Sequence, residues 1–215
     1  MKIGTDGVLL GAWTDAQKAI RVLDIGTGTG LISLMLAQRF PFAHIVGIEI
    51  DENAANEAKF NFDQSPFQDR LDLVNSSIQE FRTDDKFDLI TSNPPFFQHT
   101  HLENSPRNLA RQQSDLTFEE LIFHTDRLLS PQGEASFVIP FENERNFLQI
   151  AENYHLYPHR ITRVKGHANA EFKRSLLQLG RENVSFEPED LTIEIERNVY
   201  TPEYINLTKD FYLKM

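Results

Sequence analysis

The chain has 215 residues, of which 40% are hydrophobic and 25% charged, a composition typical of a globular protein with one sizeable core. It contains no cysteine, which excludes disulfides, thiolate metal sites and a cysteine nucleophile. No apolar run is long enough to span a bilayer, and the first residues lack the pattern of a secretory signal, so we expect a cytoplasmic protein without a membrane segment.

The net charge of -11 is unevenly distributed along the chain. Between residues 157 and 181, six arginines and lysines stand against a single glutamate. A protein that binds nucleic acid through spread positive charge would not have this balance, but one basic stretch in an acidic body is compatible with a local polyanion contact. A solvated surface of strands and loops is the simpler interpretation, so the charge alone does not show whether this stretch contacts a nucleic acid.

Apolar runs alternate with helical patterns along the chain, which is typical of an α/β fold with helices on both faces of a mostly parallel sheet. The predicted strands are residues 21–25, 44–50, 71–74, 87–91, 135–139, 160–164 and 175–179. The predicted helices are residues 31–40, 52–61, 117–129 and 142–153. No helical segment separates the final two strands, so we expect them to be antiparallel. The pattern predicts a doubly wound sheet of seven strands, mostly parallel, with the last strand antiparallel.

We expect residues 1–215 to form a single domain. Residues 1–20 precede the first strand, and residues 182–215 follow the last one. Within that closing segment, the alternation of residues 191–195 predicts an edge strand or clasp. The polar segment 98–114 has almost no core-forming residues, and a loop of that length in a compact domain is usually functional or mobile.

A glycine-rich turn, Asp24-Ile-Gly-Thr-Gly-Thr-Gly30, follows the first predicted strand and opens a helix. Its glycines let a ligand approach the backbone closely. Leu31 and Ser33 stand where the dinucleotide fingerprint G-x-G-x-x-G requires its third glycine, and the phosphate loop G-x-x-x-x-G-K-[ST] is also missing. Asp24 would repel a phosphate and attract a cationic group, such as the ammonium of an amino acid.

Glu49 stands 23 residues after Gly26, near the end of the second predicted strand. At that place, α/β sites hold a carboxylate that accepts hydrogen bonds from ribose hydroxyls. The ligand should then carry a ribose and a positively charged amino acid end, with no phosphate required. S-adenosylmethionine fits this description. The alternative interpretation is a structural tight turn beside a surface glutamate.

The sequence Asn93-Pro-Pro-Phe96 follows the fourth predicted strand, at the carboxyl edge where open α/β sheets bind ligands. Proline restricts the residue before it, so Asn93 is held in an extended conformation. The side-chain oxygen of Asn93 and the carbonyl of Pro94 can then accept both hydrogens of an NH2 group on a planar ring, with Phe96 stacked on the base. Positioning and stabilisation of the developing charge would carry the reaction without a strong base. The alternative is a rigid turn with a core phenylalanine.

The glycine turn, Glu49 and the Asn-Pro-Pro-Phe sequence together resemble class I S-adenosylmethionine-dependent methyltransferases that act on amino nitrogens. Three further segments are similar to the tRNA1(Val) adenine-N6 methyltransferase family: residues 1–13, Asn-Pro-Pro-Phe-Phe followed by Ala110-Arg-Gln112, and residues 204–212. The resemblance covers essentially the whole chain. It implies methylation of N6 of adenine 37, beside the anticodon of a valine tRNA, with S-adenosylmethionine as cofactor and tRNA as partner.

Matching positions in the family imply which residues form the site. The residues expected to bind the cofactor are Thr5, Asp6, Asp24, Gly26, Gly28, Gly30, Glu49, Ile50, Ser77, Ile78 and Asn93. Those expected to hold the adenine are Asn93, Pro94, Pro95 and Phe96. Our candidates for RNA phosphate contacts are Arg107, Arg111, Lys165, Lys173 and Arg174.

The chain departs from the family pattern in two places. Ser76-Ser77-Ile78 stands where an acidic residue often contacts the cofactor's adenine, so we expect a backbone or hydroxyl contact there. Family members also usually carry about twenty residues before the position of Met1, so by resemblance we expect a start that is either truncated or misannotated. The seven histidines show no metal-ligand spacing, so we expect no metal, and we expect a monomer.

Three alternatives stay open at this point. One is a methyltransferase acting on a glutamine amide of a protein, although such enzymes usually have a helical domain before the first strand. Another acts on guanine N2, on DNA adenine or on another exocyclic amine, although the net charge of -11 and the missing recognition domain disfavour it. The third is a non-catalytic S-adenosylmethionine-binding module, against which the intact Asn93-Pro-Pro-Phe96 argues.

Overall fold

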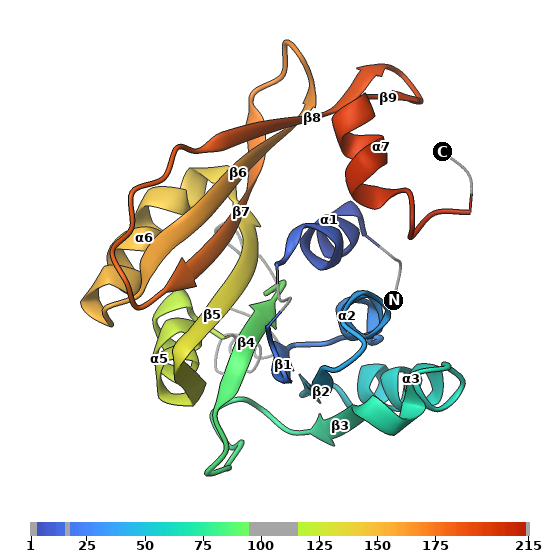
Figure 1. Ribbon diagram of the computed structural model, residues 1–215, viewed down its shortest axis with the longest axis vertical. Coiled ribbons are helices and arrows are strands. Elements are labelled where there is room, and N and C mark those ends of the chain that lie inside the picture. The colour runs from blue at the N-terminus through green and yellow to red at the C-terminus, as the bar shows by residue number, and fades with distance from the viewer. Residues whose placement is uncertain (1–3, 16–17, 95–115, 214–215) are drawn as a thin grey trace, which may run out of the picture.

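The computed structural model describes residues 4–15, 18–94 and 116–213. Within these residues, the strands form one sheet of nine with the order β3-β2-β1-β4-β5-β7-β6-β8-β9 (Figure 1). The strands are β1 Arg21–Ile25, β2 His44–Glu49, β3 Leu71–Asn75, β4 Phe87–Ser92, β5 Leu129–Pro140, β6 Tyr157–His167, β7 Phe172–Gly180, β8 Glu189–Glu196 and β9 Val199–Tyr200. The helices are α1 Thr5–Trp13, α2 Leu31–Arg39, α3 Glu52–Asp63, α5 Phe118–Leu128, α6 Glu144–Asn153 and α7 Pro202–Thr208, with 3-10 turns η1 Gln68–Arg70 and η2 Phe141–Asn143.

The half of the sheet from β3 to β5 is parallel, as the sequence pattern predicts. Its central strand β1 is buried on both faces apart from its first residue, which explains its continuous apolar run. The strand order reverses on either side of β1, because β2 lies on one side and β4 on the other. Such a reversal opens a crevice at the carboxyl ends of the strands, where open α/β sheets bind ligands.

The predicted α/β class is confirmed, but the predicted number of seven strands is wrong. β7 runs antiparallel between β5 and β6, as expected for the closing hairpin. Residues after 182 then add two more strands: β8 pairs in parallel with β6, and the two-residue β9 pairs with β8. The predicted edge strand over residues 191–195 thus belongs to the same sheet. A very short final strand limits the open edge that a longer one would present.

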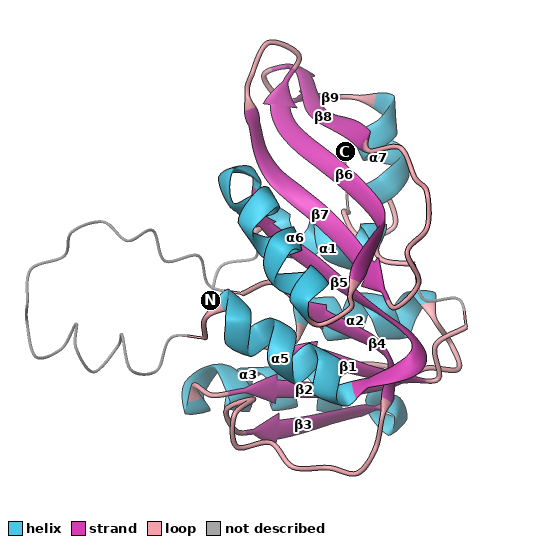
Figure 2. Ribbon diagram, turned by 90° about the vertical axis from the view of Figure 1, so that its left-hand side faces the viewer, coloured by secondary structure: helices cyan, strands magenta, loops and turns pink. Residues whose placement is uncertain are grey.

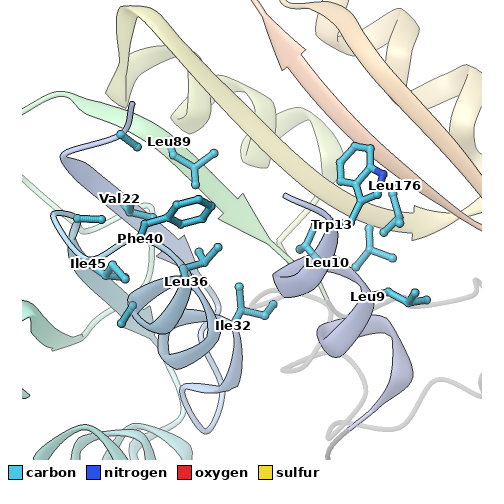
Figure 3. Close-up of a cluster of buried hydrophobic side chains, with 14 of the residues drawn as sticks. Leu9, Leu10, Trp13, Val22, Ile32, Leu36, Phe40, Ile45, Leu89 and Leu176 are labelled. Atoms are coloured by element: carbon cyan, nitrogen blue, oxygen red, sulfur yellow. The ribbon is translucent and has the colours of Figure 1, made fainter. Parts of the chain in front are cut away.

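Two apolar layers cover the sheet, because alternate residues of each strand point to opposite faces. Val22, for example, packs with the cluster under α1, α2 and α7, whereas Leu23 packs with the cluster under α5 and α6. Figure 2 shows α5 and α6 together on one face of the sheet. Figure 3 shows the other cluster, in which Leu36 of α2 and Leu10 of α1 face the strands.

Helix α1 was not predicted from the sequence. Its residues from Gly7 to Trp13 are all buried, so the helix has no polar face. A helix that is apolar all round lacks the periodicity by which helices are recognised. It packs closely on α2, where a Cβ on Gly11 would approach the Met35 sulfur to 2.8 Å and would force that side chain to move.

None of the described helices is long and apolar enough to cross a membrane. In the described part of the chain, no group of three or more histidine, aspartate or glutamate side chains is arranged to hold a metal ion.

Candidate active site

The glycine turn and Asn93 begin at neighbouring positions on the carboxyl edge of the sheet. Ile25, the last residue of β1, pairs with Ser92, the last residue of β4. The Ser92 hydroxyl also donates to the Ile25 carbonyl at 2.8 Å. Gly26 and Asn93 therefore leave adjacent strands side by side, roughly 5 Å apart. The fold thus brings the two sequence motifs together.

The backbone of the glycine turn is fixed on β2 and leaves one side open. The N–H groups of Gly26 and Thr27 both donate to the Ile48 carbonyl at 2.9 Å. Gly26 has a φ of +70°, and a Cβ on it would meet nothing within 4 Å. Gly30, in contrast, has a φ of +87°, and a Cβ there would collide with the ring of Phe62. Gly26 therefore leaves room for a ligand, whereas Gly30 makes room for the protein's own core.

Asp24 lies beneath this turn, where its side chain is fully buried. Its carboxylate accepts hydrogen bonds from the hydroxyls of Thr27 at 2.7 Å, Ser33 at 2.8 Å and Thr91 at 3.0 Å. Burial raises the pKa of Asp24, and the three hydroxyl donors oppose that rise. Asp24 thus joins β1, the turn, α2 and β4 into one unit, a role that the sequence did not reveal. Its expected attraction for a cofactor ammonium stays a prediction.

Glu49 closes the other side of the turn. Its buried carboxylate accepts from the backbone N–H of Gly28 at 2.8 Å and from that of Asp51 at 2.9 Å. A carboxylate offers about four acceptor positions, so Glu49 keeps capacity for ribose hydroxyls. The next residue, Ile50, is apolar yet 57% exposed at the same edge. Glu49 and Ile50 therefore place an acceptor and an apolar surface next to the open side of Gly26.

The serine segment after β3 lies beside Glu49, because Asn75 pairs with Glu49 in the sheet and the Ser76 N–H donates to the Glu49 carbonyl at 3.0 Å. The Ser77 hydroxyl accepts from the Glu80 N–H at 3.2 Å and so caps the following turn. The Ile78 side chain packs in the hydrophobic core, which leaves only its backbone for a ligand.

Asn93 is half-buried and Pro94 is buried, at the point where α1 and α2 begin. A Cβ placed on Gly7 of α1 would lie 3.9 Å from Asn93 Nδ2 and 3.4 Å from Leu31 Cδ2. The amide of Asn93 is therefore next to both helices and to the end of the glycine turn. Pro95, Phe96, Arg107 and Arg111, and the polar segment 98–114, lie outside the described residues.

The first turn of α1 carries Thr5, which is exposed, and Asp6, which is half-buried. Arg174 of β7 donates from Nε to Asp6 Oδ2 at 2.7 Å. The structure thus connects an expected cofactor residue with an expected RNA contact. Lys165 lies on β6, and Lys173 lies on β7 beside Arg174. Arg174 pairs with Pro140, the last residue of β5. These three cations therefore share the carboxyl edge of the sheet with the site.

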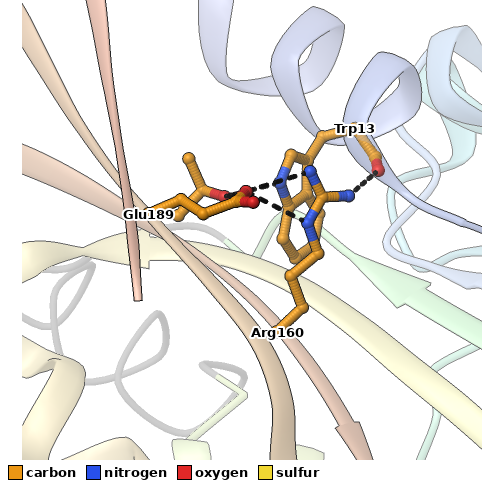
Figure 4. Close-up of polar contacts among 4 residues, drawn as sticks. Trp13, Arg160 and Glu189 are labelled. Atoms are coloured by element: carbon orange, nitrogen blue, oxygen red, sulfur yellow. Dashed lines mark hydrogen bonds and ion pairs between the residues drawn. The ribbon is translucent and has the colours of Figure 1, made fainter. Parts of the chain in front are cut away.

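The other end of α1 is held by a second set of contacts, which the sequence did not reveal (Figure 4). Trp13 Nε1 donates to the Thr162 hydroxyl at 2.8 Å, and the guanidinium of Arg160 lies 4.6 Å from the centre of the Trp13 ring. Arg160 also pairs with Glu189 at 3.2 Å. Contacts from β6, β7 and β8 thus fix both ends of α1, and with them the position of Gly7 against Asn93.

Comparisons with known proteins agree with this geometry. Residues 3–149 match the family model of the methyltransferase small domain. Two proteins named tRNA1(Val) (adenine(37)-N6)-methyltransferase are similar to this chain over its whole length. The one from Flavobacterium johnsoniae is 49% identical and the one from Flavobacterium psychrophilum is 50% identical. In both cases the match covers 100% of this chain and 94% of the relative. The relative of that name from Bacteroides thetaiotaomicron is 43% identical, with 100% of this chain and 92% of the relative covered.

Two solved structures share the fold at low sequence identity. A protein described as a predicted O-methyltransferase from Agrobacterium tumefaciens superimposes with a TM-score of 0.75 at 18% identity, covering 95% of this chain and 96% of that one. A glycopeptide N-methyltransferase superimposes with a TM-score of 0.61 at 10% identity, covering 82% and 95%. The sheet, the glycine turn and the family model define the class as a methyltransferase. Within that class, the chain belongs to the tRNA1(Val) (adenine(37)-N6)-methyltransferase family, which confirms the resemblance predicted from the sequence.

Proposed function

We propose that this chain transfers a methyl group from S-adenosylmethionine to N6 of adenine 37 in a valine tRNA. Relatives that are named for that reaction are similar to this chain over its full length. The structural observation that carries the proposal is the meeting of Asn93 with the glycine turn at the ends of β4 and β1. The reaction takes place in the cytoplasm, where tRNA is the available substrate.

The residues at the sheet edge fit S-adenosylmethionine. The open side of Gly26 admits a ligand against the backbone, and the remaining acceptor positions of Glu49 suit a ribose. Ile50 supplies an exposed apolar surface for an adenine ring. The groups that donate hydrogen bonds to Asp24, three hydroxyls and the backbone N–H of Ser33, are all neutral, so its carboxylate favours a cationic ligand above the turn. When bound, S-adenosylmethionine supplies a methyl group on a positively charged sulfur.

Asn93 and Pro94 hold the amine that receives the methyl group. The Asn93 side-chain oxygen and the Pro94 carbonyl accept hydrogen bonds from its two N–H groups. The proline fixes the backbone from which both acceptors project. An exocyclic amine is a weak nucleophile because its lone pair is delocalised into the ring, and two acceptors return electron density to the nitrogen. These acceptors also stabilise the positive charge that develops there, and the surplus proton leaves to water after transfer. Positioning by Asn93 supplies much of the rate.

The experiment that tests this function uses labelled S-adenosylmethionine with tRNA from cells that lack the protein, followed by mass analysis of the nucleosides. We expect N6-methyladenine in valine tRNA and none in a transcript whose adenine 37 is replaced by guanine. A parallel reaction with protein extract tests methylation of a glutamine amide. Label in protein and none in tRNA would contradict the proposal, as would an intact protein that labels neither.

A further inference from the structure

Four side chains beside the end of β5 form a row in which two neighbouring aromatic rings lie between two cations. The rings of Phe141 and Phe172 lie 5.3 Å apart between centroids and are tilted by 53°. The guanidinium of Arg163 lies 5.7 Å from the centre of the Phe141 ring, and Lys165 Nζ lies 5.3 Å from that of Phe172. We call these four residues the aromatic–cation row. All four side chains are half-buried, so part of each ring faces solvent.

The aromatic–cation row lies near the proposed methylation site. Ser92, the residue before Asn93, pairs with Phe137 of β5. Pro140 ends β5 three residues further along, roughly 10 Å in the strand direction, and Phe141 follows it. Figure 1 shows the hairpin of β6 and β7, which carries the other three members, rising beyond the ends of β4 and β5.

The arrangement of the row is fixed by Glu144. Arg163 donates from Nε and from a terminal nitrogen to the Glu144 carboxylate at 2.8–3.2 Å, and the Ser175 hydroxyl donates to the same carboxylate at 2.5 Å. Glu144 is itself buried, so the bidentate pair holds the guanidinium against Phe141. The rings are thus presented in a set orientation, and the stack does not need Lys165 to stay in place.

The lysines of the hairpin are the cations most available to a phosphate. Lys173 follows Phe172 in the sequence, and its side chain is 69% exposed. Its acidic neighbour Glu171 approaches only to 4.0 Å with a side chain that is 92% exposed, so water screens that pair. Lys165 adds a second ammonium over the face of Phe172. Proteins that bind single-stranded nucleic acid combine such aromatic faces with neighbouring cations, because bases stack on the rings while phosphates meet the charges.

We propose that the aromatic–cation row binds an unpaired nucleotide next to the target adenine, with the base on Phe172 or Phe141 and the phosphate on Lys165 and Lys173. This inference rests on the proposed function, since it takes the substrate to be a tRNA loop. Stacking on this row would hold the loop while the adenine leaves it for Asn93. It also explains how a protein with a net charge of -11 binds a polyanion, because the contact is confined to one edge.

Binding of an anticodon stem-loop of valine tRNA, measured by fluorescence anisotropy, tests the stacking. Phe141→Leu and Phe172→Leu keep the apolar packing but remove the ring, and we expect each to weaken binding by about tenfold. Phe172→Trp restores a face for stacking and should bind as the wild type does. Phe42→Leu is the matched control, since Phe42 is 84% exposed ahead of β2 and away from the row. Affinity for S-adenosylmethionine should stay unchanged in all four variants.

The phosphate contact has its own measurement. Lys165→Gln should lower the slope of log affinity against log salt by about one, as expected for the loss of one phosphate contact. Stem-loop binding that is unchanged in both leucine variants, or a Phe172→Trp variant as weak as Phe172→Leu, would overturn the stacking role. An unchanged salt slope would overturn the phosphate contact. Wild-type protein that binds the stem-loop but methylates no tRNA would contradict the proposed function. The binding results of the variants would then still show whether the aromatic–cation row binds RNA.

Discussion

Arg174 Nε donates to Asp6 Oδ2 at 2.7 Å, and this ion pair joins the start of β7 to the first turn of α1. The two residues are 168 positions apart in the sequence. Gly7, which follows Asp6, lies against the amide of Asn93. The pair therefore fixes the helix end that borders the candidate catalytic side chain, and it connects the basic hairpin to the cofactor side of the site.

Asp6→Asn is expected to lower kcat by roughly threefold to thirtyfold, because α1 loses its hold on β7 next to Asn93. The free energy of unfolding should fall by less than about 1 kcal/mol, since both side chains are partly exposed. Steady-state kinetics and urea unfolding measure the two effects. Exchanging the charges, with Asp6→Arg and Arg174→Asp together, should restore part of kcat. An unchanged kcat in Asp6→Asn would show that the pair has no positioning role.

Glu49→Ala is expected to weaken S-adenosylmethionine binding by about tenfold to a hundredfold, because a charged acceptor of hydrogen bonds is lost. Isothermal titration of the cofactor gives this number directly. Glu52→Gln is the control, since Glu52 is an exposed glutamate only three residues away at the start of α3. Equal dissociation constants for the wild type and Glu49→Ala would remove Glu49 from the cofactor site.

Gly30→Ala and Gly26→Ala should separate the structural glycine from the ligand-facing one. Alanine at position 30 meets the ring of Phe62 in a left-handed backbone, so we expect a loss of about 3 kcal/mol in the free energy of unfolding. Alanine at position 26 has space, so only the positive φ costs stability, by about 1 kcal/mol. Its methyl group instead occupies the open side and weakens cofactor binding. Urea unfolding of the two variants tests the difference, and equal losses would contradict the steric assignment.

Asp24 gives a prediction for pH. Burial raises its pKa above the unfolded value of about 4, so the folded state binds the proton more tightly than the unfolded state does. Its contribution to stability is therefore present below that unfolded value and is lost as the pH rises through the folded pKa. Asparagine does not titrate, so Asp24→Asn should not lose stability in this way. As the pH rises from 3 toward neutrality, the free energy of unfolding of the variant should therefore rise relative to that of the wild type. Urea titrations across that range test it, and a shift toward the wild type would mean that hydroxyl donors outweigh burial.

The sequence was informative where chemistry depends on neighbouring residues. The glycine turn, Glu49 and Asn93 were each recognised from short motifs, and the sheet brings all three to one edge. The seven predicted strands are all present. β1 and β4 are clear in the sequence because their apolar runs mark strands that are buried on both faces. The basic stretch in the hairpin was also visible, although its aromatic partner Phe141 lies outside it.

What the sequence did not predict depends on contacts between distant residues. Asp24 meets Thr91 across 67 positions, and Trp13 meets Thr162 across 149. Such contacts have no local periodicity, so neither the buried role of Asp24 nor the fixing of α1 could be predicted. The strands β8 and β9 were incompletely predicted for a similar reason, since their pairing with β6 and with each other follows from the way the closing segment returns to the sheet.

The central claim is that Asn93 holds the adenine amine, and that its contribution to cofactor binding is small beside its contribution to transfer. Single-turnover transfer to valine tRNA and cofactor titration, both carried out on Asn93→Ala, test this claim most directly, with the exposed Asn56→Ala on α3 as control. We predict a transfer rate at least about 100-fold lower with nearly unchanged affinity for S-adenosylmethionine. A rate within a few fold of the wild type, or a loss of cofactor binding together with the rate, would contradict it.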